Sequence, residues 1–163
     1  MALTTKLEVN DIQLALYNSK LWNNRQYLFV PNVSWGLFSY ELDLAIMSKD
    51  GYVTEIEIKR SWEDFLADFK KKHTHNDERV YYFAYCVPES LASKVCDYLD
   101  NYFDEDNDKP AVFYYNEKGT IYRSKFGSIF RPGNHRHLFL EERYQLARLG
   151  TFRFWELLKK TLK

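Results

Sequence analysis

The sequence lacks several features that would assign it to a class at once. Only two of its 163 residues are cysteines, Cys86 and Cys96, and their spacing fits neither a disulfide framework nor a zinc site. No apolar run approaches the ~20 residues of a membrane-spanning helix, and the first residues hold no apolar signal segment. We therefore expect a soluble, cytoplasmic protein without a membrane partner, with both cysteines in the core.

The chain also lacks an excess of charge of either sign, because its 23 lysines and arginines equal its 23 aspartates and glutamates. A neutral chain has no overall field that attracts a polyanion, so any contact with nucleic acid must come from local patches. We find no repeat, low-complexity tract or linker. With 45% apolar residues the chain can bury a core without staples, and we expect one domain over residues 1–163.

What is present is a pattern of alternating helices and strands. A capping box at Asn10 and Gln13 begins a helix near residues 10–21, and a strand over 27–35 contains Pro31, which indicates a break or a sheet edge. The apolar spacing then predicts a hairpin over 41–61, a helix over 62–73, a buried strand over 79–87 and a helix over 89–103. A second hairpin begins at 111, and one or two long helices follow from about 138, with Gly150 as a potential break.

The hairpin ELDLAIMSKDGYVTEIEIKRS, residues 41–61, has a register that its turn predicts. A three-residue loop closed by Gly51 places Ser48 opposite Tyr52, so paired residue numbers sum to 100. Asp43 then lies opposite Glu57 and Glu41 opposite Lys59, while Leu44 meets Ile56 on the other face. We expect the apolar face to pack on the first two helices, and the acids to lie inside a sheet.

Opposed carboxylates about 5 Å apart repel each other unless a cation lies between them. Mg²⁺ or Mn²⁺ would neutralise Asp43 and Glu57 more completely than Lys59 does, since such ions take carboxylate and phosphate oxygens. Two acids, a lysine and a divalent metal form a site that can hydrolyse phosphodiesters. A simple solvated face is the competing interpretation, because alternating charges on an exposed hairpin are common.

Other charged residues have simpler interpretations. Asp68 precedes Lys72 by four residues, which predicts a surface ion pair. His73 and His75 lack a third soft ligand, so we expect no zinc site there. Candidates for contact with phosphates are Lys70 and Lys72 near the end of the second helix and, in the segment RPGNHRH, Arg131 and Arg136.

At these residues the sequence resembles the PD-(D/E)XK nuclease superfamily. The order helix, strand, Asp43 strand, Glu57-Ile58-Lys59 strand, helix and strand is similar to its core, with Leu42-Asp43 where many members have Pro-Asp. The strings EIEIKRSWEDFLADFKKKH and YYFAYCVPESL are similar to the MmcB-like branch, associated with bacterial DNA repair, and to small phage or prophage nuclease-like proteins. The resemblance covers residues 10–100 or so.

The resemblance implies a mixed α/β fold, a restriction endonuclease-like αβββαβ core, to which a hairpin and C-terminal helix over about 110–163 are added. It implies that Asp43, Glu57 and the backbone carbonyl of Ile58 bind the metal and that Lys59 is catalytic. Many members add an acid from the first helix, for which Asp11 is preferred over Glu8.

We therefore expect a Mg²⁺- or Mn²⁺-dependent nuclease that acts on DNA in repair or in phage DNA processing. The alternative is a catalytically silent module that binds nucleic acid or protein and keeps only the fold. The sequence leaves open whether the chain forms a homodimer.

Overall fold

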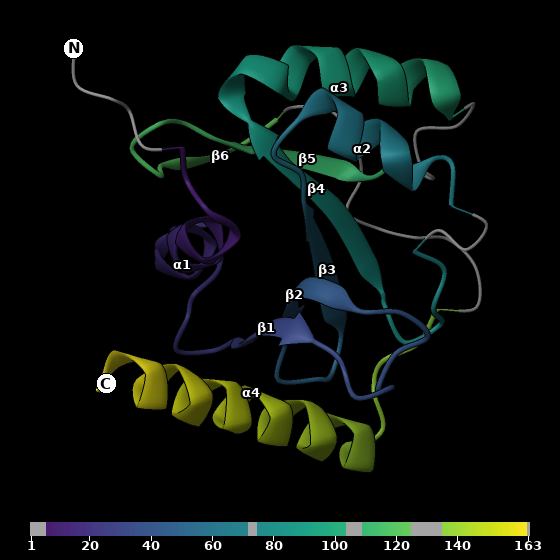
Figure 1. Ribbon diagram of the computed structural model, residues 1–163. Coiled ribbons are helices and arrows are strands. Elements are labelled where there is room, and N and C mark those ends of the chain that lie inside the picture. The colour runs from purple at the N-terminus through teal and green to yellow at the C-terminus, as the bar shows by residue number, and fades with distance from the viewer. Residues whose placement is uncertain (1–5, 72–74, 104–108, 125–134, 163) are drawn as a thin grey trace.

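The computed structural model describes residues 6–71, 75–103, 109–124 and 135–162. Its six strands form one mixed sheet in the order β1-β2-β3-β4-β5-β6 (Figure 1). The elements are α1 (Val9–Asn18), β1 (Leu28–Val33), β2 (Leu42–Met47), β3 (Val53–Ile58), α2 (Trp62–Asp68), β4 (Tyr82–Pro88), α3 (Glu89–Tyr102), β5 (Ala111–Tyr115), β6 (Ile121–Arg123) and α4 (Leu140–Thr161). β3, β4 and β5 run parallel to one another, whereas the other neighbours are antiparallel.

The order of the first six elements, α1-β1-β2-β3-α2-β4, is the predicted αβββαβ core, and the mixed α/β fold class is confirmed. The added hairpin is β5 and β6, and β5 continues the sheet beside β4. The predicted edge at Pro31 is also confirmed, because β1 is the outermost strand and proline cannot donate to a further neighbour.

The register predicted for the first hairpin is confirmed. Leu44 lies opposite Ile56 and Ile46 opposite Thr54. The turn is closed as expected, because the N–H of Gly51 donates to the carbonyl of Ser48, at 3.0 Å, and Gly51 has φ +87°. Glycine adopts this left-handed conformation at little cost, so the turn fixes which residues share a face.

One face of the sheet packs on α1. Ile12 and Leu16 of that helix are fully buried against Leu44, Ile56 and Cys86. The alternation of side chains along β2 and β3 then directs Ala45, Glu55 and Glu57 to the opposite face.

The opposite face is covered in two parts. Phe65 of α2 and Val95 of α3 pack on Phe83 and Tyr85 of β4, while Leu146 and Leu149 of α4 pack near β1 on Val30 and Ala45. The expectation that α2 would lie on the apolar face of the hairpin is therefore wrong. Since α2 connects the parallel strands β3 and β4, it crosses on the face that carries the acids, and α1 occupies the other.

The helix ends also differ from the expectation. α1 begins at Val9, and its N-terminus is capped by Asp11, whose Oδ2 accepts a hydrogen bond of 2.8 Å from the N–H of Glu8. The predicted box at Asn10 and Gln13 is wrong because both residues lie inside the helix. α2 ends at Asp68, earlier than predicted, although Ser61 caps it as its position indicates.

α4 is one continuous helix of 22 residues, so Gly150 does not break it. A methyl group at residue 150 would lie 3.1 Å from Cγ2 of Val30, so this glycine lets the helix approach β1 closely. Within the described residues, no helix has the length and apolar character needed to cross a membrane.

Candidate metal centre on the hairpin

The polar face of the hairpin is buried. Glu55 has no exposed surface, and the side chains of Glu57 and Lys59 are nearly as enclosed. All three belong to β3 or follow it directly, in the middle of the sheet between β2 and β4. The interpretation of the acids as a solvated surface is thus wrong for these three residues. Glu41, just before β2, is exposed.

Lys59 lies at the centre of this group. Its Nζ is 2.8 Å from Oε1 of Glu57 and 2.8 Å from Oδ1 of Asp68, which α2 brings over the sheet. Burial alone would lower the pKa of Lys59, but the two carboxylates raise it to about 12. The ammonium group is therefore charged at every physiological pH.

His75 joins two further carboxylates. Its Nδ1 lies 2.6 Å from Oε1 of Glu55, and its Nε2 lies 3.0 Å from Oδ2 of Asp68. Because a carboxylate only accepts hydrogen bonds, both ring nitrogens donate and the ring is an imidazolium. Burial opposes this charge, yet the bonds to Asp68 and Glu55 raise the pKa of His75 to about 9.

The four carboxylates differ in how well they are neutralised. Burial would raise the pKa of Asp68, but hydrogen bonds from His75, Lys59 and Lys71 hold it well below its ordinary value. In contrast, burial and the charge of Asp43 raise the pKa of Glu57 to about 7, and burial also raises the pKa of Asp43. The uncompensated negative charge therefore lies on Asp43 and Glu57.

The balance of charges in the cluster agrees with this. Asp43, Glu55, Glu57 and Asp68 are four acids, whereas Lys59 and His75 are the two buried cations. When all are ionised, the acids exceed the two buried cations by two charges, and Lys71, a more exposed lysine that also pairs with Asp68, lowers the excess to one. A divalent cation at Asp43 and Glu57 would neutralise the remaining negative charge, as expected of a Mg²⁺ or Mn²⁺ site.

Two sets of donors can be considered for such an ion. Glu55, Glu57 and His75 each offer a ligand atom within 4.8 Å of the others. However, His75 would have to lose a proton, and Glu55 already accepts hydrogen bonds from His75 and from the hydroxyl of Tyr40 at 2.8 Å.

The second set is Asp43, Glu57 and the carbonyl of Ile58. Oδ2 of Asp43 accepts from the N–H of Ile58, at 2.8 Å. Within the described part of the chain, Oδ1 of Asp43 and Oε2 of Glu57 receive no hydrogen bond. We favour this set because one carboxylate oxygen of Asp43 and one of Glu57 are free to bind an ion, and because these two residues have the raised pKa values.

α1 reaches the site through Gln13 rather than Asp11. Nε2 of Gln13 donates to the backbone carbonyl of Asp43, at 2.7 Å, and to Oδ1 of Asn32, at 3.1 Å. This bond fixes the backbone that carries Asp43. Asp11 is exposed and caps its own helix, so its role as a metal ligand stays a prediction without a supporting contact.

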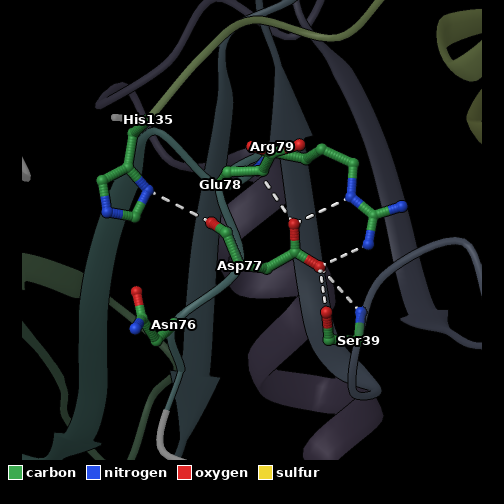
Figure 2. Close-up of a pocket in the computed structure, with 6 residues that line it drawn as sticks. All are labelled: Ser39, Asn76, Asp77, Glu78, Arg79 and His135. Atoms are coloured by element: carbon green, nitrogen blue, oxygen red, sulfur yellow. Dashed lines mark hydrogen bonds and ion pairs between the residues drawn. The ribbon is translucent and has the colours of Figure 1, made fainter. Parts of the chain in front are cut away.

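The segment that carries His75 is anchored by a second network (Figure 2). Asp77 accepts hydrogen bonds from the N–H and the hydroxyl of Ser39, at 2.7 and 2.8 Å, and from the backbone and guanidinium of Arg79. Burial alone would raise the pKa of Asp77, but these hydrogen bonds hold it well below its ordinary value. The residues around Asp77 line a pocket of about 480 Å³: Ser39, Asn76, Asp77, Glu78, Arg79 and His135.

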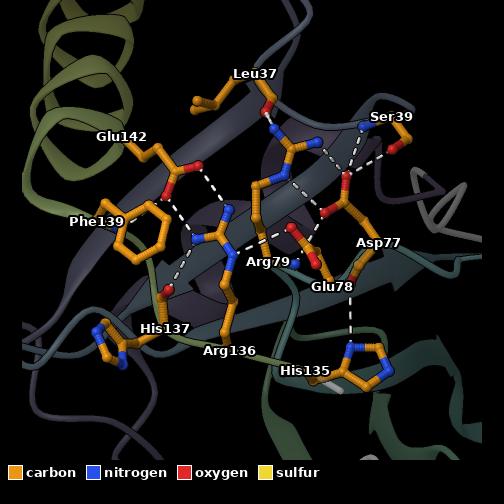
Figure 3. A network of polar contacts seen from close by, with 10 residues as sticks. All are labelled: Leu37, Ser39, Asp77, Glu78, Arg79, His135, Arg136, His137, Phe139 and Glu142. Carbon is orange, nitrogen blue, oxygen red and sulfur yellow. Dashed lines mark hydrogen bonds and ion pairs between the residues drawn. The ribbon is translucent and has the colours of Figure 1, made fainter. Parts of the chain in front are cut away.

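Figure 3 shows how this network continues to the start of α4. The guanidinium of Arg136 forms two hydrogen bonds with Glu142, at 2.8 and 2.9 Å, and a third with Glu78 at 3.2 Å. The sequence predicts that Arg136 contacts nucleic acid, whereas in this structure its guanidinium is hydrogen-bonded to the carboxylates of Glu78 and Glu142. Lys70 is exposed, whereas the other two candidates, Lys72 and Arg131, lie outside the described residues.

Two members of the cluster, Asp68 and His75, were not predicted from the sequence. Asp68 was expected in a surface ion pair with Lys72, but its side chain is buried and pairs with Lys59. Its position three residues after Phe65, on the buried stripe of α2, is the signal that could have indicated this. His75 carried no signal beyond its histidine spacing, since only the fold brings it to Glu55.

Comparisons with known proteins show the fold and nothing further. No known protein family and no curated protein matches the sequence. One solved structure is similar, the SPO1766 protein of unknown function from Silicibacter pomeroyi, with a TM-score of 0.54 and 13% sequence identity over 86% of this chain and 82% of that chain. At this identity the likeness is one of architecture.

Proposed function

We propose that the protein is a metal-dependent nuclease that hydrolyses phosphodiester bonds in DNA with Mg²⁺ or Mn²⁺. One observation carries the proposal: a cluster of four carboxylates and two cations, buried except for the half-buried Asp43, whose unbalanced charge lies on Asp43 and Glu57. The αβββαβ order of the elements supports membership of the PD-(D/E)XK superfamily, in which these two positions bind metal. The cytoplasmic location expected from the sequence is compatible with this role.

Asp43, Glu57 and the carbonyl of Ile58 would hold the ion. When bound, it would supply Lewis-acid stabilisation of charge on the phosphate and lower the pKa of a nearby water. The hydrogen bond from the N–H of Ile58 orients the carboxylate of Asp43, and Gln13 holds its backbone.

Lys59 has a role that its contacts define. An ammonium group has three N–H donors, and Glu57 and Asp68 use two of them. The third can donate to a phosphate oxygen as negative charge develops in the transition state. With a pKa of about 12, Lys59 stabilises charge and does not act as a general base at neutral pH.

The experiment is a cleavage assay on linear duplex, single-stranded and branched DNA with Mg²⁺, Mn²⁺ or EDTA. We expect metal-dependent cleavage that is lost in Glu57→Gln and in Lys59→Met. Glu41→Gln, which changes an exposed acid beside the same hairpin, is the matched control and should cleave normally.

Circular dichroism and thermal melting establish that the variants are folded. Cleavage that survives both substitutions would place the reaction elsewhere. DNA binding without cleavage of any of the three substrates would overturn the nuclease proposal in favour of a binding module with a nuclease-like fold.

A further inference from the structure

A pocket of about 700 Å³ opens at the carboxyl ends of the three parallel strands. Arg60 lies two residues after β3, Pro88 ends β4 and Tyr115 ends β5, and all three line the pocket. The carboxyl ends of parallel strands are a common place for ligands, because loops and helix N-termini meet there. The volume is within the range of pockets that hold small molecules.

This pocket is separate from the carboxylate cluster. Tyr115 belongs to the core that packs on α1, and the guanidinium of Arg60 bonds to Glu8, just before α1, at 2.7 and 3.1 Å. Glu57 and Lys59 instead direct their side chains to the face that α2 crosses. A ligand in the pocket would therefore not use the metal ligands or the lysine of the proposed nuclease site.

The hydroxyl group of Tyr115 is an unpaired donor in this pocket. Tyr115 is only 7% exposed, and its hydroxyl has no hydrogen-bond partner among the described residues. In that part of the chain, the side-chain atoms that are both sealed from solvent and unpaired are Nε of Arg60 and Nε of Arg153, so the hydroxyl of Tyr115 opens into the pocket. Burial raises the pKa of Tyr115 to about 12, and the hydroxyl therefore keeps its proton at neutral pH.

The N-terminus of α3 supplies further donors at the same place. α3 has 14 residues, and its N-cap, Pro88, makes no side-chain hydrogen bond to the first turn. The N–H groups of a first turn have no partner within the helix, and they carry the positive end of the helix dipole. Ser90, in this turn, adds a hydroxyl to the pocket wall. Helix N-termini with free N–H groups bind phosphate groups readily.

Three cationic side chains also line the pocket: Lys6, Arg60 and Lys118. Net charge alone does not identify an anion site, because the exposed acids Glu89 and Glu117 line it too and Glu8 pairs with Arg60. Arg60 is the best placed of the cations, since its side chain is 27% exposed and its Nε is buried without a partner. Directed donors thus favour an anion more than the overall charge does.

We propose that this pocket binds the phosphate group of a small phosphomonoester. The hydroxyl of Tyr115, the first-turn N–H groups of α3 and the guanidinium of Arg60 donate to the phosphate oxygens. A phosphate group has three strong acceptor oxygens, one for each kind of donor, whereas a carboxylate has two. Leu7 and Pro88, the apolar lining, contact the organic part of the ligand.

NMR titration of the backbone amides tests the proposal, with EDTA present so that no metal contributes. We expect ribose 5-phosphate to shift the signals of Ser90 and Leu91 saturably, and to bind more tightly than inorganic phosphate. Tyr115→Phe should weaken binding about tenfold, because it removes a hydrogen bond to a charged group and keeps the ring. Tyr114→Phe is the matched control, since Tyr114 packs on the opposite face of β5 and should leave binding unchanged.

A second pair of variants tests the cation. Arg60→Gln should weaken binding, whereas Arg123→Gln, an exposed change on β6, should not. Thermal melting establishes that all four variants are folded. The absence of saturable shifts with both probes would overturn the proposal, and so would unchanged binding by Tyr115→Phe. Succinate, which carries only carboxylates, should bind more weakly, and equal affinity for it would refute the assignment to a phosphate group.

Discussion

Lys59 and Asp68 are nine residues apart in the sequence, and their side chains meet inside the protein with Nζ 2.8 Å from Oδ1. The same aspartate accepts a hydrogen bond from His75 through its other oxygen, at 3.0 Å. Asp68 therefore positions both cations of the cluster, although it is not among the proposed metal ligands. This gives it a role that differs from those of Asp43 and Glu57.

We expect Asp68→Asn to reduce DNA cleavage strongly and to leave Mn²⁺ binding nearly unchanged. The amide keeps the size of the side chain but leaves Lys59 and His75 with less compensation, so the free energy of unfolding should fall by about 1–3 kcal/mol. Urea unfolding and Mn²⁺ titration check the two effects. Glu63→Gln, an exposed change on the same helix, is the control. Equal loss of metal affinity and cleavage would make Asp68 a ligand instead.

We expect Asp43→Asn to stabilise the metal-free protein at pH 8 and to abolish metal binding. The carboxyl groups of Asp43 and Glu57 both have raised pKa values, so each destabilises the fold once the pH exceeds its ordinary pKa. Removing one of the two charges should raise the free energy of unfolding by on the order of 1 kcal/mol, which is about the free-energy equivalent of one pKa unit. The gain should shrink at pH 5, where protonation already relieves the repulsion. Thermal melting at both pH values measures it, and a destabilised variant at pH 8 contradicts the proposed strain.

Mn²⁺ affinity should rise steeply with pH between about 6 and 8. The pKa of Glu57 in the metal-free protein is about 7, and a protonated carboxyl group cannot bind the ion, so protons compete with metal below that pH. Calorimetric titration should show close to a tenfold loss of affinity per pH unit below 7. Glu57→Gln should remove this dependence together with most of the affinity. A flat profile over the same range would assign binding to other ligands.

Asp77→Asn tests whether the second network holds His75 in place. Asp77 lies two residues after His75, and its carboxylate bonds to both Ser39 and Arg79. Because these bonds lower the pKa of Asp77, they stabilise the fold at pH values above the ordinary carboxyl pKa, and this stabilisation is lost in acid. We expect a loss of about 2–4 kcal/mol in unfolding free energy at pH 7, since Asp77 is buried. Urea unfolding measures the loss, and Glu78→Gln, an exposed neighbour, should cost much less.

The same change should also alter the titration of His75. NMR of the imidazole should show its pKa moving from about 9 toward the ordinary value as the ring loses its fixed position. An unchanged His75 titration in a destabilised Asp77→Asn protein would separate the two networks.

Much of the fold could be predicted because it follows from local patterns. The turn at Gly51 and the alternation along β2 and β3 determine the register, and this register was predicted correctly. The order α1-β1-β2-β3-α2-β4 also follows from apolar periodicity. The predicted helix ends were less accurate, because neighbouring polar residues such as Asn10 and Asp11 are equally plausible caps in the sequence.

The sequence by itself determined that Asp43, Glu57 and Lys59 share one face of a hairpin, since strand alternation and turn geometry act over a few residues. Only the tertiary structure decided that α2 crosses over that face, that Asp68 is buried there, and that His75 reaches Glu55. These contacts depend on how elements pack and on the burial that results, and burial sets the pKa values of the acids. A local pattern carries no information on which polar face another helix will enclose.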